Sequence, residues 1–475
     1  MCFWGYNNCR TIIDKFEDVW YNFRICKYGN KMPLDTARRN YKMCAQLFST
    51  QPYKGARDFY PEDMELRNWF LGKVREVLTL ASYDEYNAPM LESLDIYVAK
   101  SGEELAKKQT YNFEDRGGRQ VAIRPEMTPS VARLVAARLQ QLNMPLRWYS
   151  IPNLYRNEQP QRGRLREFWQ INADIFGCDS YEADLEIIRT AIEMLLCFGA
   201  DESMFVVRIN NRRFFNDVIA RICDADGEGA RLVSKVIDRR EKVTREAYVS
   251  SLKELGLSDE KIEKLDALYT MSVDEATSIC PESEGSQELK KLFEALRDLD
   301  LEKYCIFDFG IIRGLDYYTG TVFEVFDKHP ENTRAMFGGG RYDNLVGLFA
   351  KNAHLPGVGF GCGDVTLQNF LESHNLIPEE YSKKVKVLIT RFDDVPFVKY
   401  SELSAKLREN GIISATYIGS KKFGKQIDFA SKEHYSHVVI MGASELEAGV
   451  VKIKDLDAHE ETTVNFGELI EYFKK

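Results

Sequence analysis

The stretch that decides the fold is Glu167-Phe168-Trp169-Gln170-Ile171-Asn172-Ala173-Asp174-Ile175-Phe176. Because successive side chains of a β-strand point to opposite faces, this stretch separates into two sets of residues. One set is apolar and predicts a face that packs against a core: Trp169, Ile171, Ala173 and Ile175. The other set carries aromatic, amide and carboxylate groups and predicts a ligand-binding face: Phe168, Gln170, Asn172 and Asp174.

This strand is predicted to be one half of a long antiparallel hairpin. A second strand-like run, Trp148 to Arg156, precedes it, and a polar loop, Asn157 to Arg166, joins the two. Further strand-like runs occur at Cys305 to Phe309 and at Thr321 to Phe326. The three consecutive glycines Gly338-Gly339-Gly340 predict a close backbone approach or unusual dihedral angles. The sequence therefore predicts an antiparallel sheet.

The domain organisation follows from length and pattern. A chain of 475 residues predicts about three folding units at roughly 150 residues each. Residues 1–50 are expected to be a loosely ordered or disordered extension, with a mitochondrial presequence as the second interpretation because the segment is basic. Residues 51–382 are expected to form an α+β domain with a helical insertion at about 211–300. Alternating short strands and helices predict a small α/β domain over residues 385–475.

Composition limits the location and the partners. No apolar run approaches the ~20 residues that span a bilayer. The ten cysteines include no Cys-x-x-Cys pair, which argues against a structural zinc site. The net charge of -9 predicts that any polyanion is bound by local clusters of basic residues. We therefore expect a cytoplasmic protein without a membrane segment, with a mitochondrial form as the alternative.

Two common nucleotide-binding motifs are incomplete in this chain. Gly419 to Lys425 resembles a P-loop, but Gln426 stands where Ser or Thr would bind magnesium. In the run Gly357 to Gly363, Cys362 stands where a dinucleotide-binding motif needs its third glycine. The pair His434-x-x-His437 has no third ligand nearby, so no metal site built from protein ligands is predicted. The remaining arginines, carboxylates and aromatic residues suit phosphoryl chemistry by positioning and charge stabilisation.

These motifs resemble those of the class II aminoacyl-tRNA synthetases, and within that class the histidyl-tRNA synthetase family, over about Lys54 to Lys475. The helix from Pro61 that leads to Pro89 is similar to motif 1, the dimer-forming element, and Tyr155 to Phe168 is similar to motif 2. Three blocks are similar to motifs of the histidine-specific family: Arg124-Pro125-Glu126-Met127-Thr128, Arg313-Gly314-Leu315-Asp316-Tyr317-Tyr318-Thr319 and Gly338-Gly339-Gly340-Arg341-Tyr342-Asp343. The resemblance implies an antiparallel-sheet catalytic domain with a helical insertion, followed by an α/β anticodon-binding domain.

The resemblance also implies a role for each candidate residue. ATP would be bound by Arg156, Glu158, Arg164, Phe168 and Arg341. Histidine would be bound by Glu126, Thr128, Gln170, Asp174, Tyr317 and Tyr318. Asp174 and Tyr318 would bond the two imidazole nitrogens. The catalytic residues would be Arg313 and Arg156. Arg156 would hold the α-phosphate of ATP, and Arg313 would stabilise charge on it during attack by the histidine carboxylate. Magnesium would accompany the pyrophosphate.

The sequence departs from the commoner family pattern in motif 3. In Gly361-Cys362-Gly363-Asp364-Val365-Thr366, Thr366 occupies the usual position of an arginine that contacts ATP. Either another cation such as Arg341 compensates for this change or nucleotide binding is weakened, and our hypothesis is compensation.

The implied activity is that of a histidine–tRNA ligase, which forms histidyl-adenylate from histidine and ATP and then charges the 3'-terminal adenosine of tRNA(His). Contacts with tRNA are expected from Arg162 and Arg164 in the motif 2 loop, and from Lys421, Lys422 and Lys425 in the C-terminal domain. A homodimer is implied through motif 1. The alternative is a non-catalytic module that regulates a biosynthetic enzyme or senses tRNA.

Overall fold

The computed structural model describes residues 49–101, 108–312, 318–351, 353–379, 381 and 384–474. The chain divides into two compact units, Met1–Asp58 and Phe59–Lys475. In the first unit, residues 49–58 are described, and there Ala56 N donates to Tyr53 O at 2.8 Å. The predicted extension over residues 1–50 therefore falls almost entirely outside the described residues. Within the described parts of the chain, no helix combines the length and the apolar character needed to cross a membrane.

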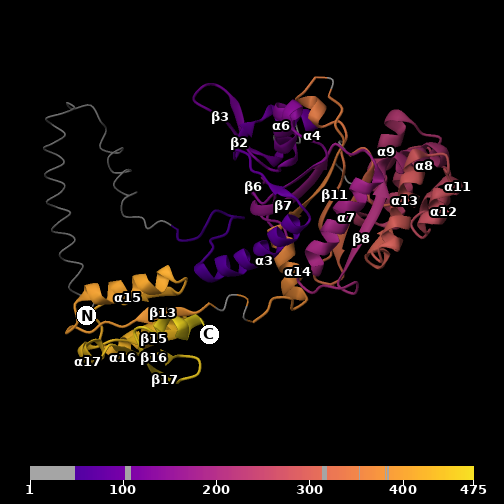
Figure 1. The fold of residues 1–475 in the computed structure, drawn as a ribbon. Helices are drawn as coiled ribbons and strands as arrows, with labels where there is room; N and C mark the ends of the chain where they lie inside the picture. The colour runs from indigo at the N-terminus through magenta and orange to yellow at the C-terminus, as the bar shows by residue number, and fades with distance from the viewer. Residues whose placement is uncertain are drawn as a thin grey trace, which may run out of the picture. The chain divides into compact units, whose positions relative to one another are not determined.

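A sheet of nine described strands forms the centre of the second unit (Figure 1). Its strands lie in this order: β1 (Asp84–Glu85), β5 (Leu146–Ser150), β7 (Glu167–Phe176), β12 (Gly357–Gly363), β11 (Ala335–Arg341), β10 (Thr321–Asp327), β8 (Phe205–Asn211) and β9 (Cys305–Phe307), with β6 (Asn153–Tyr155) paired to β7. Neighbouring strands are antiparallel except for the two edge pairs β1 with β5 and β8 with β9. The predicted antiparallel sheet is confirmed.

The predicted hairpin is confirmed, with one interruption. β7 pairs antiparallel with both β5 and β6, which together make up the expected first strand. Ile151 and Pro152 separate these two strands, because proline has no N–H to donate to the ladder. Pro152 O still accepts a hydrogen bond from Gln170 N at 3.1 Å, so β7 continues unbroken beside both.

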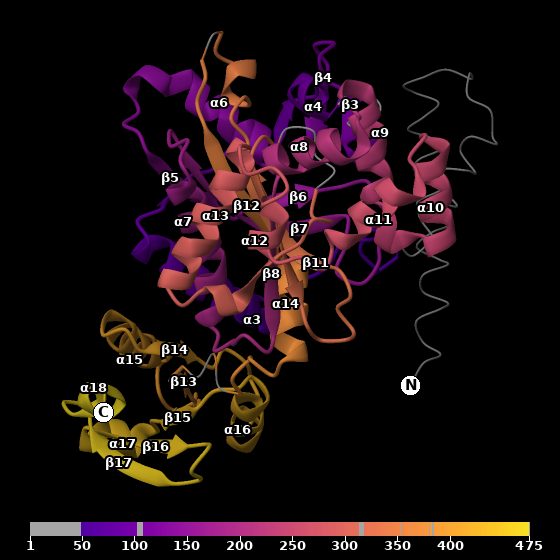
Figure 2. The same ribbon diagram turned by 90° about the vertical axis from the view of Figure 1, so that its right-hand side faces the viewer.

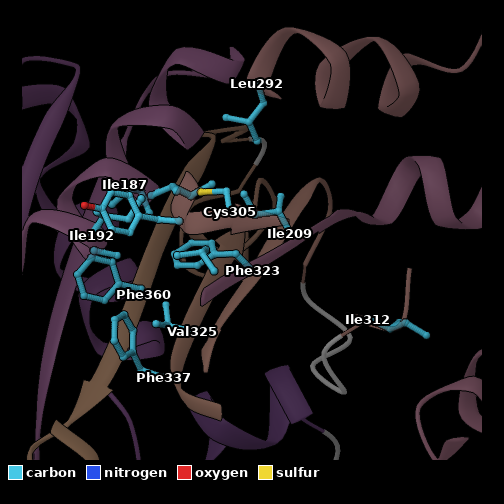
Figure 3. Close-up of a cluster of buried hydrophobic side chains, with 14 of the residues drawn as sticks. Ile187, Ile192, Ile209, Leu292, Cys305, Ile312, Phe323, Val325, Phe337 and Phe360 are labelled. Carbon is cyan, nitrogen blue, oxygen red and sulfur yellow. The ribbon is translucent and has the colours of Figure 1, made fainter. Parts of the chain in front are cut away.

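Helices pack against one face of this sheet and form the main core with it. The helices of this unit that bury apolar side chains there include α3 (Pro61–Leu80), α7 (Tyr181–Leu196) and α14 (Asp364–Ser373). Ile171, Ala173 and Ile175 of β7 are buried in this core, and Trp169 packs against it. In Figure 3, Phe337 and Phe360 from neighbouring strands lie side by side with ring centroids 5.6 Å apart. The apolar face predicted for β7 is therefore confirmed.

A group of helices is inserted between β8 and β9 and extends the same core (Figure 1, right). The helices are α8 (Arg212–Cys223), α9 (Gly227–Ile237), α10 (Arg245–Glu254), α11 (Asp259–Ala267), α12 (Val273–Thr277) and α13 (Glu284–Asp298). Five of them begin at a residue whose side-chain oxygen accepts a hydrogen bond from a backbone N–H of the first turn: Asn211, Thr244, Ser258, Ser272 and Ser283. Such caps satisfy N–H groups that a helix leaves unpaired, so the local sequence fixes where these helices start.

A small sheet lies beside the block at residues 124–128. Its order is β2 (Leu91–Ser93), β4 (Gln120–Ile123) and β3 (Tyr111–Glu114), next to α4 (Asp95–Ser101) and α6 (Thr128–Arg138). β2 follows Pro89 and is an edge strand, as a nearby proline favours. Arg124 is buried and joins three segments: its Nε donates to Asn153 O at 3.0 Å, and its Nη1 donates to Ala88 O at 2.5 Å.

The C-terminal residues form a five-stranded sheet covered by helices (Figure 2). The strand order is β14 (Ile413–Thr416), β13 (Lys386–Ile389), β15 (His437–Ile440), β16 (Val450–Asp455) and β17 (Glu461–Asn465), with helices α15 (Phe397–Glu409), α16 (Phe423–Lys432), α17 (Ala443–Ala448) and α18 (Leu469–Lys474). The first three strands are parallel, and the last two add antiparallel. This is the small α/β fold that the alternating pattern predicts.

A buried ion pair ties the sheet to α7. Arg341, at the end of β11, and Asp184, on α7, are 1% and 2% exposed, and Arg341 Nη2 lies 2.9 Å from Asp184 Oδ1. Arg341 also donates to Cys178 O and Ser180 O at 2.8 Å each. Thr321 Oγ1 donates to Asp184 Oδ2 at 3.0 Å. Every charged group of this pair is therefore compensated inside the protein.

We expect Arg341→Met to lower the free energy of unfolding by about 3–5 kcal/mol, because it leaves the Asp184 carboxylate buried without its cation. The matched control is Arg231→Met. Arg231 pairs with Glu228 at 3.3 Å on the surface, with both side chains more than half exposed, and such pairs contribute about 1 kcal/mol or less. Scanning calorimetry would compare the unfolding temperatures. Equal temperatures for the two variants would contradict the structural role of Arg341.

Candidate active site

The polar face of β7 forms the floor of a cavity of about 500 Å³. All four residues predicted for the ligand-binding face line it: Phe168, Gln170, Asn172 and Asp174. The alternation that is visible in the sequence therefore separates core from cavity from Phe168 to Ile175.

Most of the candidate residues from distant parts of the chain meet in this cavity. Besides β7, the lining includes the following predicted residues: Glu126, Thr128, Arg156, Glu158, Arg162, Arg164 and Tyr318. Arg313 and Tyr317 lie outside the described residues. Lys421, Lys422 and Lys425 belong to the C-terminal α/β fold and precede or begin α16.

Arg156 lines the cavity and is fixed there by one of its three guanidinium nitrogens. Its Nε donates to Pro125 O at 2.9 Å, and its guanidinium carbon lies 5.3 Å from the centre of the Phe168 ring. Its two terminal nitrogens have no hydrogen-bond partner among the described residues. A guanidinium fixed by one nitrogen and open at the other two is suited to a bidentate contact with a phosphate.

The motif 2 loop is a tight turn that carries charged side chains along the cavity. Gln161 and Arg164 exchange two backbone hydrogen bonds of 2.9 Å, and Gly163 between them has a φ of 75°, which favours glycine. Arg164 Nη1 lies 3.4 Å from Glu158 Oε2. Arg162 Nη2 lies 3.0 Å from Glu331 Oε2, so the loop touches the segment between β10 and β11.

Glycines on β12 make room for the polar side chains of β7. In the pairing of these strands, Asp174 lies opposite Gly359, Asn172 opposite Gly361 and Gln170 opposite Gly363. A Cβ atom on Gly359 would lie 2.2 Å from Asp174 Oδ1. A Cβ atom on Gly361 would lie 2.8 Å from Gln170 Nε2. The glycines therefore let the side chains of Asp174 and Gln170 approach the β12 backbone closely, although they do not form a dinucleotide-binding motif.

Asp174 is set in a buried aromatic surrounding. The hydroxyl of Tyr342 donates to Asp174 Oδ1. Burial raises the pKa of the Tyr86 hydroxyl well above its ordinary value, and the nearby Asp174 carboxylate raises it further. Tyr86 therefore stays a neutral phenol. A carboxylate at this depth is suited to accept a hydrogen bond from a buried N–H of a ligand.

The expectation that Arg341 contacts ATP is wrong. In the strand pairing, Arg341 lies opposite Val358, and Val358 lies opposite Ile175, so Arg341 shares the core face of the sheet. Its guanidinium is occupied by Asp184 and by the backbone carbonyls of Cys178 and Ser180. Arg341 therefore does not compensate for the missing arginine at position 366.

The sequence assigned no ligand role to several lining residues, among them Tyr342, Glu324 and Arg334. Tyr342 lies in a block that resembles a histidine-specific motif, but the sequence gave it no role, because its hydroxyl reaches Asp174 only through the pairing of β11 with β12. Glu324 could have been found, since it alternates with the apolar Phe323 and Val325 in a predicted strand. Arg334 precedes β11 and lines the cavity from the segment that follows Glu331.

Comparisons with known proteins show the family of this chain. The sequence model of the family described as histidyl-tRNA synthetase matches residues 55–363, and that of the anticodon binding domain matches residues 386–475. The histidine–tRNA ligase of Leptospira biflexa serovar Patoc is 42% identical over 91% of this chain and 99% of its own length. The chain belongs to the histidyl-tRNA synthetase family.

Other relatives cover nearly the same span. The histidine–tRNA ligase of Thermoplasma volcanium is 39% identical over 89% of this chain and 98% of its own length. The crystal structure of histidyl-tRNA synthetase from Nostoc sp. PCC 7120 matches with a TM-score of 0.75 and 25% identity, over 90% of this chain and 99% of that one. The resemblance seen in the motifs and the class II fold with its two domains are thus confirmed.

We expect Gly361→Ala to weaken the binding of histidine, the ligand that the motif resemblance predicts for this face, by about 10-fold. The added methyl group would displace the Gln170 amide, and a lost buried hydrogen bond costs ~1–3 kcal/mol. The nearest atoms to the new Cβ belong to the side chains of Gln170 and Asn172, so the sheet itself is retained.

Calorimetric titration with histidine measures this effect. Gly72→Ala on α3 is the matched control, because a Cβ there meets no atom within 4 Å. The interpretation of the β12 glycines would be wrong if Gly361→Ala bound histidine as tightly as this control.

Proposed function

We propose that this protein is a histidine–tRNA ligase that activates histidine with ATP and transfers it to the 3'-terminal adenosine of tRNA(His). The observation that carries the proposal is the meeting of two groups of residues in one cavity. Arg156 and Phe168 suit a nucleotide, and Asp174, Gln170 and Tyr318 suit an amino acid with a polar ring. The strong similarity to histidine–tRNA ligases over nine-tenths of the chain supports the same assignment.

On the nucleotide side, Phe168 stacks on the adenine ring and Glu158 accepts a hydrogen bond from its amino group. Arg156 bonds the α-phosphate through its two terminal nitrogens, since Pro125 O already holds the third. Arg164, paired with Glu158, lies where it can support the same nucleotide. Stacking on an aromatic ring contributes ~1–3 kcal/mol per base, so the adenine is an anchor that leaves the phosphates to the arginines.

On the amino acid side, Asp174 and Tyr318 bond the two imidazole nitrogens. The Tyr342 hydroxyl orients the Asp174 carboxylate for this contact. Glu126, Thr128 and Gln170 hold the ammonium group, and Tyr317 completes the pocket. An apolar ring of the same size would leave buried polar groups unpaired at a cost of ~1–3 kcal/mol each, so the site rejects it.

The chemistry needs no nucleophile from the protein. Among the described lining residues there is no His, Cys, Ser or Lys. A histidine carboxylate oxygen attacks the α-phosphorus, the new P–O bond forms, and the bond to pyrophosphate breaks. Arg156 and Arg313 neutralise the charge that builds on the α-phosphate. The tRNA hydroxyl then takes the histidyl group and releases AMP.

Magnesium accompanies the phosphates of ATP. The described residues contain no group of three or more potential metal ligands, and Mg²⁺ typically takes one or two carboxylates together with phosphate oxygens. Glu324 on the cavity floor is such a carboxylate, so the lining fits the ion. When bound, the ion would neutralise charge on the leaving pyrophosphate.

The remaining partners follow from the same assignment. We assign residues 51–382 to the catalytic domain, with the helical insertion at about 211–300, and residues 385–475 to anticodon binding. Arg162 and Arg164 approach the acceptor end of the tRNA. Two chains associate through motif 1 as a homodimer, with a two-fold axis. We also propose a cytoplasmic location, with a mitochondrial form as the alternative, as expected from the sequence.

The second candidate is a non-catalytic regulatory module. One structural neighbour is an ATP phosphoribosyltransferase regulatory subunit/histidyl-tRNA synthetase from Bacillus halodurans C, with a TM-score of 0.68 and 24% identity, which shows the fold alone. The retention of Arg156, Glu158 and Phe168 in the cavity favours catalysis.

We expect ATP–pyrophosphate exchange with histidine and with no other standard amino acid, measured in magnesium buffer without tRNA. Exchange with histidine alone tests adenylate formation and side-chain selectivity together. A folded protein that binds tRNA and catalyses no exchange would instead be the regulatory module.

We expect the double variant Lys421→Ala/Lys422→Ala to weaken tRNA binding and to flatten its salt dependence. Both lysines are exposed, and Lys422 is the N-cap of α16. Each lost phosphate contact reduces the slope of log affinity against log salt by ~0.7–0.9. Lys425 is already paired with Asp428 at 2.8 Å and should contribute less.

Filter binding of tRNA over a series of salt concentrations measures this slope. Lys432→Ala, at the far end of α16, is the matched control. An unchanged slope in the double variant would show that these two lysines do not contact the tRNA phosphates.

A further inference from the structure

The motif 3 position in this chain carries no charge. Thr366 Oγ1 donates to Met336 O at 2.8 Å, which ties the start of α14 to the start of β11. Its methyl carbon lies 3.4 Å from where a Cβ on Gly163 would stand, so the motif 2 loop covers it. The cavity therefore lacks a cation at the place where the family pattern has one.

The absence of a cation at position 366 matters because the cavity lining has few positive charges to spare for a triphosphate. The described lining contains five carboxylates, Glu126, Glu158, Asp174, Glu324 and Glu331, and four arginines, Arg156, Arg162, Arg164 and Arg334. A triphosphate cannot be bound well in such a lining unless several cations face it. Arg162 and Arg164 are paired with Glu331 and Glu158, and the proposed function gives Arg156 to the α-phosphate.

Arg334 is the one arginine of the described lining that has neither an ion pair nor a role in the proposed function. It is exposed to the cavity mouth and has no hydrogen bond or ion pair with any described residue. It lies two residues before Met336, whose carbonyl accepts the hydrogen bond of Thr366. Two residues span at most about 7 Å. The flexible Arg334 side chain can therefore bring its guanidinium into the space that an arginine at position 366 would fill.

The segment that carries Arg334 is anchored at its base. The Asp327 side chain is fully buried and accepts hydrogen bonds from His329 N at 2.7 Å and from Asn332 Nδ2 at 2.6 Å. His374 Nε2 on α14 lies 2.8 Å from Asp327 Oδ1. Glu331 and Arg162 add a weak surface ion pair to the same segment. Arg334 thus projects from a fixed backbone, which reduces the entropy lost when it binds a ligand.

We propose that Arg334 replaces the motif 3 arginine and binds the pyrophosphate half of ATP. The proposal rests on the proposed function and assigns the contact with the pyrophosphate half of ATP to one residue. Attack on the α-phosphorus is roughly in line, so the leaving pyrophosphate points away from histidine. Histidine is held at the buried end by Asp174, which is 4% exposed. The pyrophosphate therefore points toward the open rim, where Arg334 stands.

The first test is Arg334→Ala in the full-length protein. We expect the ATP concentration for half-maximal exchange to rise about 10- to 100-fold, as for loss of a charge-assisted contact, while that for histidine changes less than twofold. Calorimetric titration should show weaker ATP binding and unchanged AMP binding, because AMP lacks the β- and γ-phosphates. Arg231→Ala, on the helical insertion, is the control and should match the wild type.

The second test is rescue by position. In Arg334→Ala/Thr366→Arg, the cation returns at the motif 3 position, and ATP affinity should recover by at least tenfold relative to the single variant. A purely structural role of Arg334 would not be restored by this change.

Two outcomes would overturn the inference. One is an Arg334→Ala protein with wild-type ATP affinity, and the other is an equal loss of AMP and ATP affinity. If the wild type catalyses no exchange, the proposed function fails instead, and the titrations with ATP and AMP still decide the role of Arg334.

Discussion

The register between β7 and β12 is the constraint on which the site depends. It sets glycines opposite Gln170, Asn172 and Asp174, and sets Cys362, Phe360 and Val358 opposite the apolar residues of β7. One face of the strand pair therefore carries polar groups that no neighbouring side chain crowds, while the other face packs as a core. A shift by one residue would exchange the two faces, bringing polar groups into the core and apolar groups into the cavity.

The buried network beneath the sheet gives this arrangement its rigidity. Arg341 and Asp184 join β11 to α7, and Arg213 on α8 pairs with both Glu288 on α13 and Asp343 after β11. The helical insertion is thus connected to the end of β11 through charged groups, which are fully buried at Arg341 and Asp184 and partly exposed at Arg213. Such groups are costly when unpaired, so the network favours one packing of helices on the sheet.

Much of the fold could be predicted because its causes are local. The alternation in Glu167 to Phe176, the hairpin around it and the capped helices of the insertion depend on neighbours within a few residues. The candidate site was predicted where a strand face carries side chains that alternate, as in β7. The prediction for Arg341 was wrong because glycines interrupt the alternation of side chains before it. Gly338, Gly339 and Gly340 give no indication of which face Arg341 occupies.

The sequence by itself determined the family, the antiparallel sheet and the set of residue types in the cavity, because motifs and periodicity are properties of adjacent residues. Only the tertiary structure decided which arginine lines the cavity and which is buried in the core. Arg341 turns into the core because its strand pairs in a register that aligns it with Val358 and Ile175, whereas Arg334 lies just before that strand and faces the cavity. Register is set by packing between segments far apart in the chain, so no local pattern encodes it.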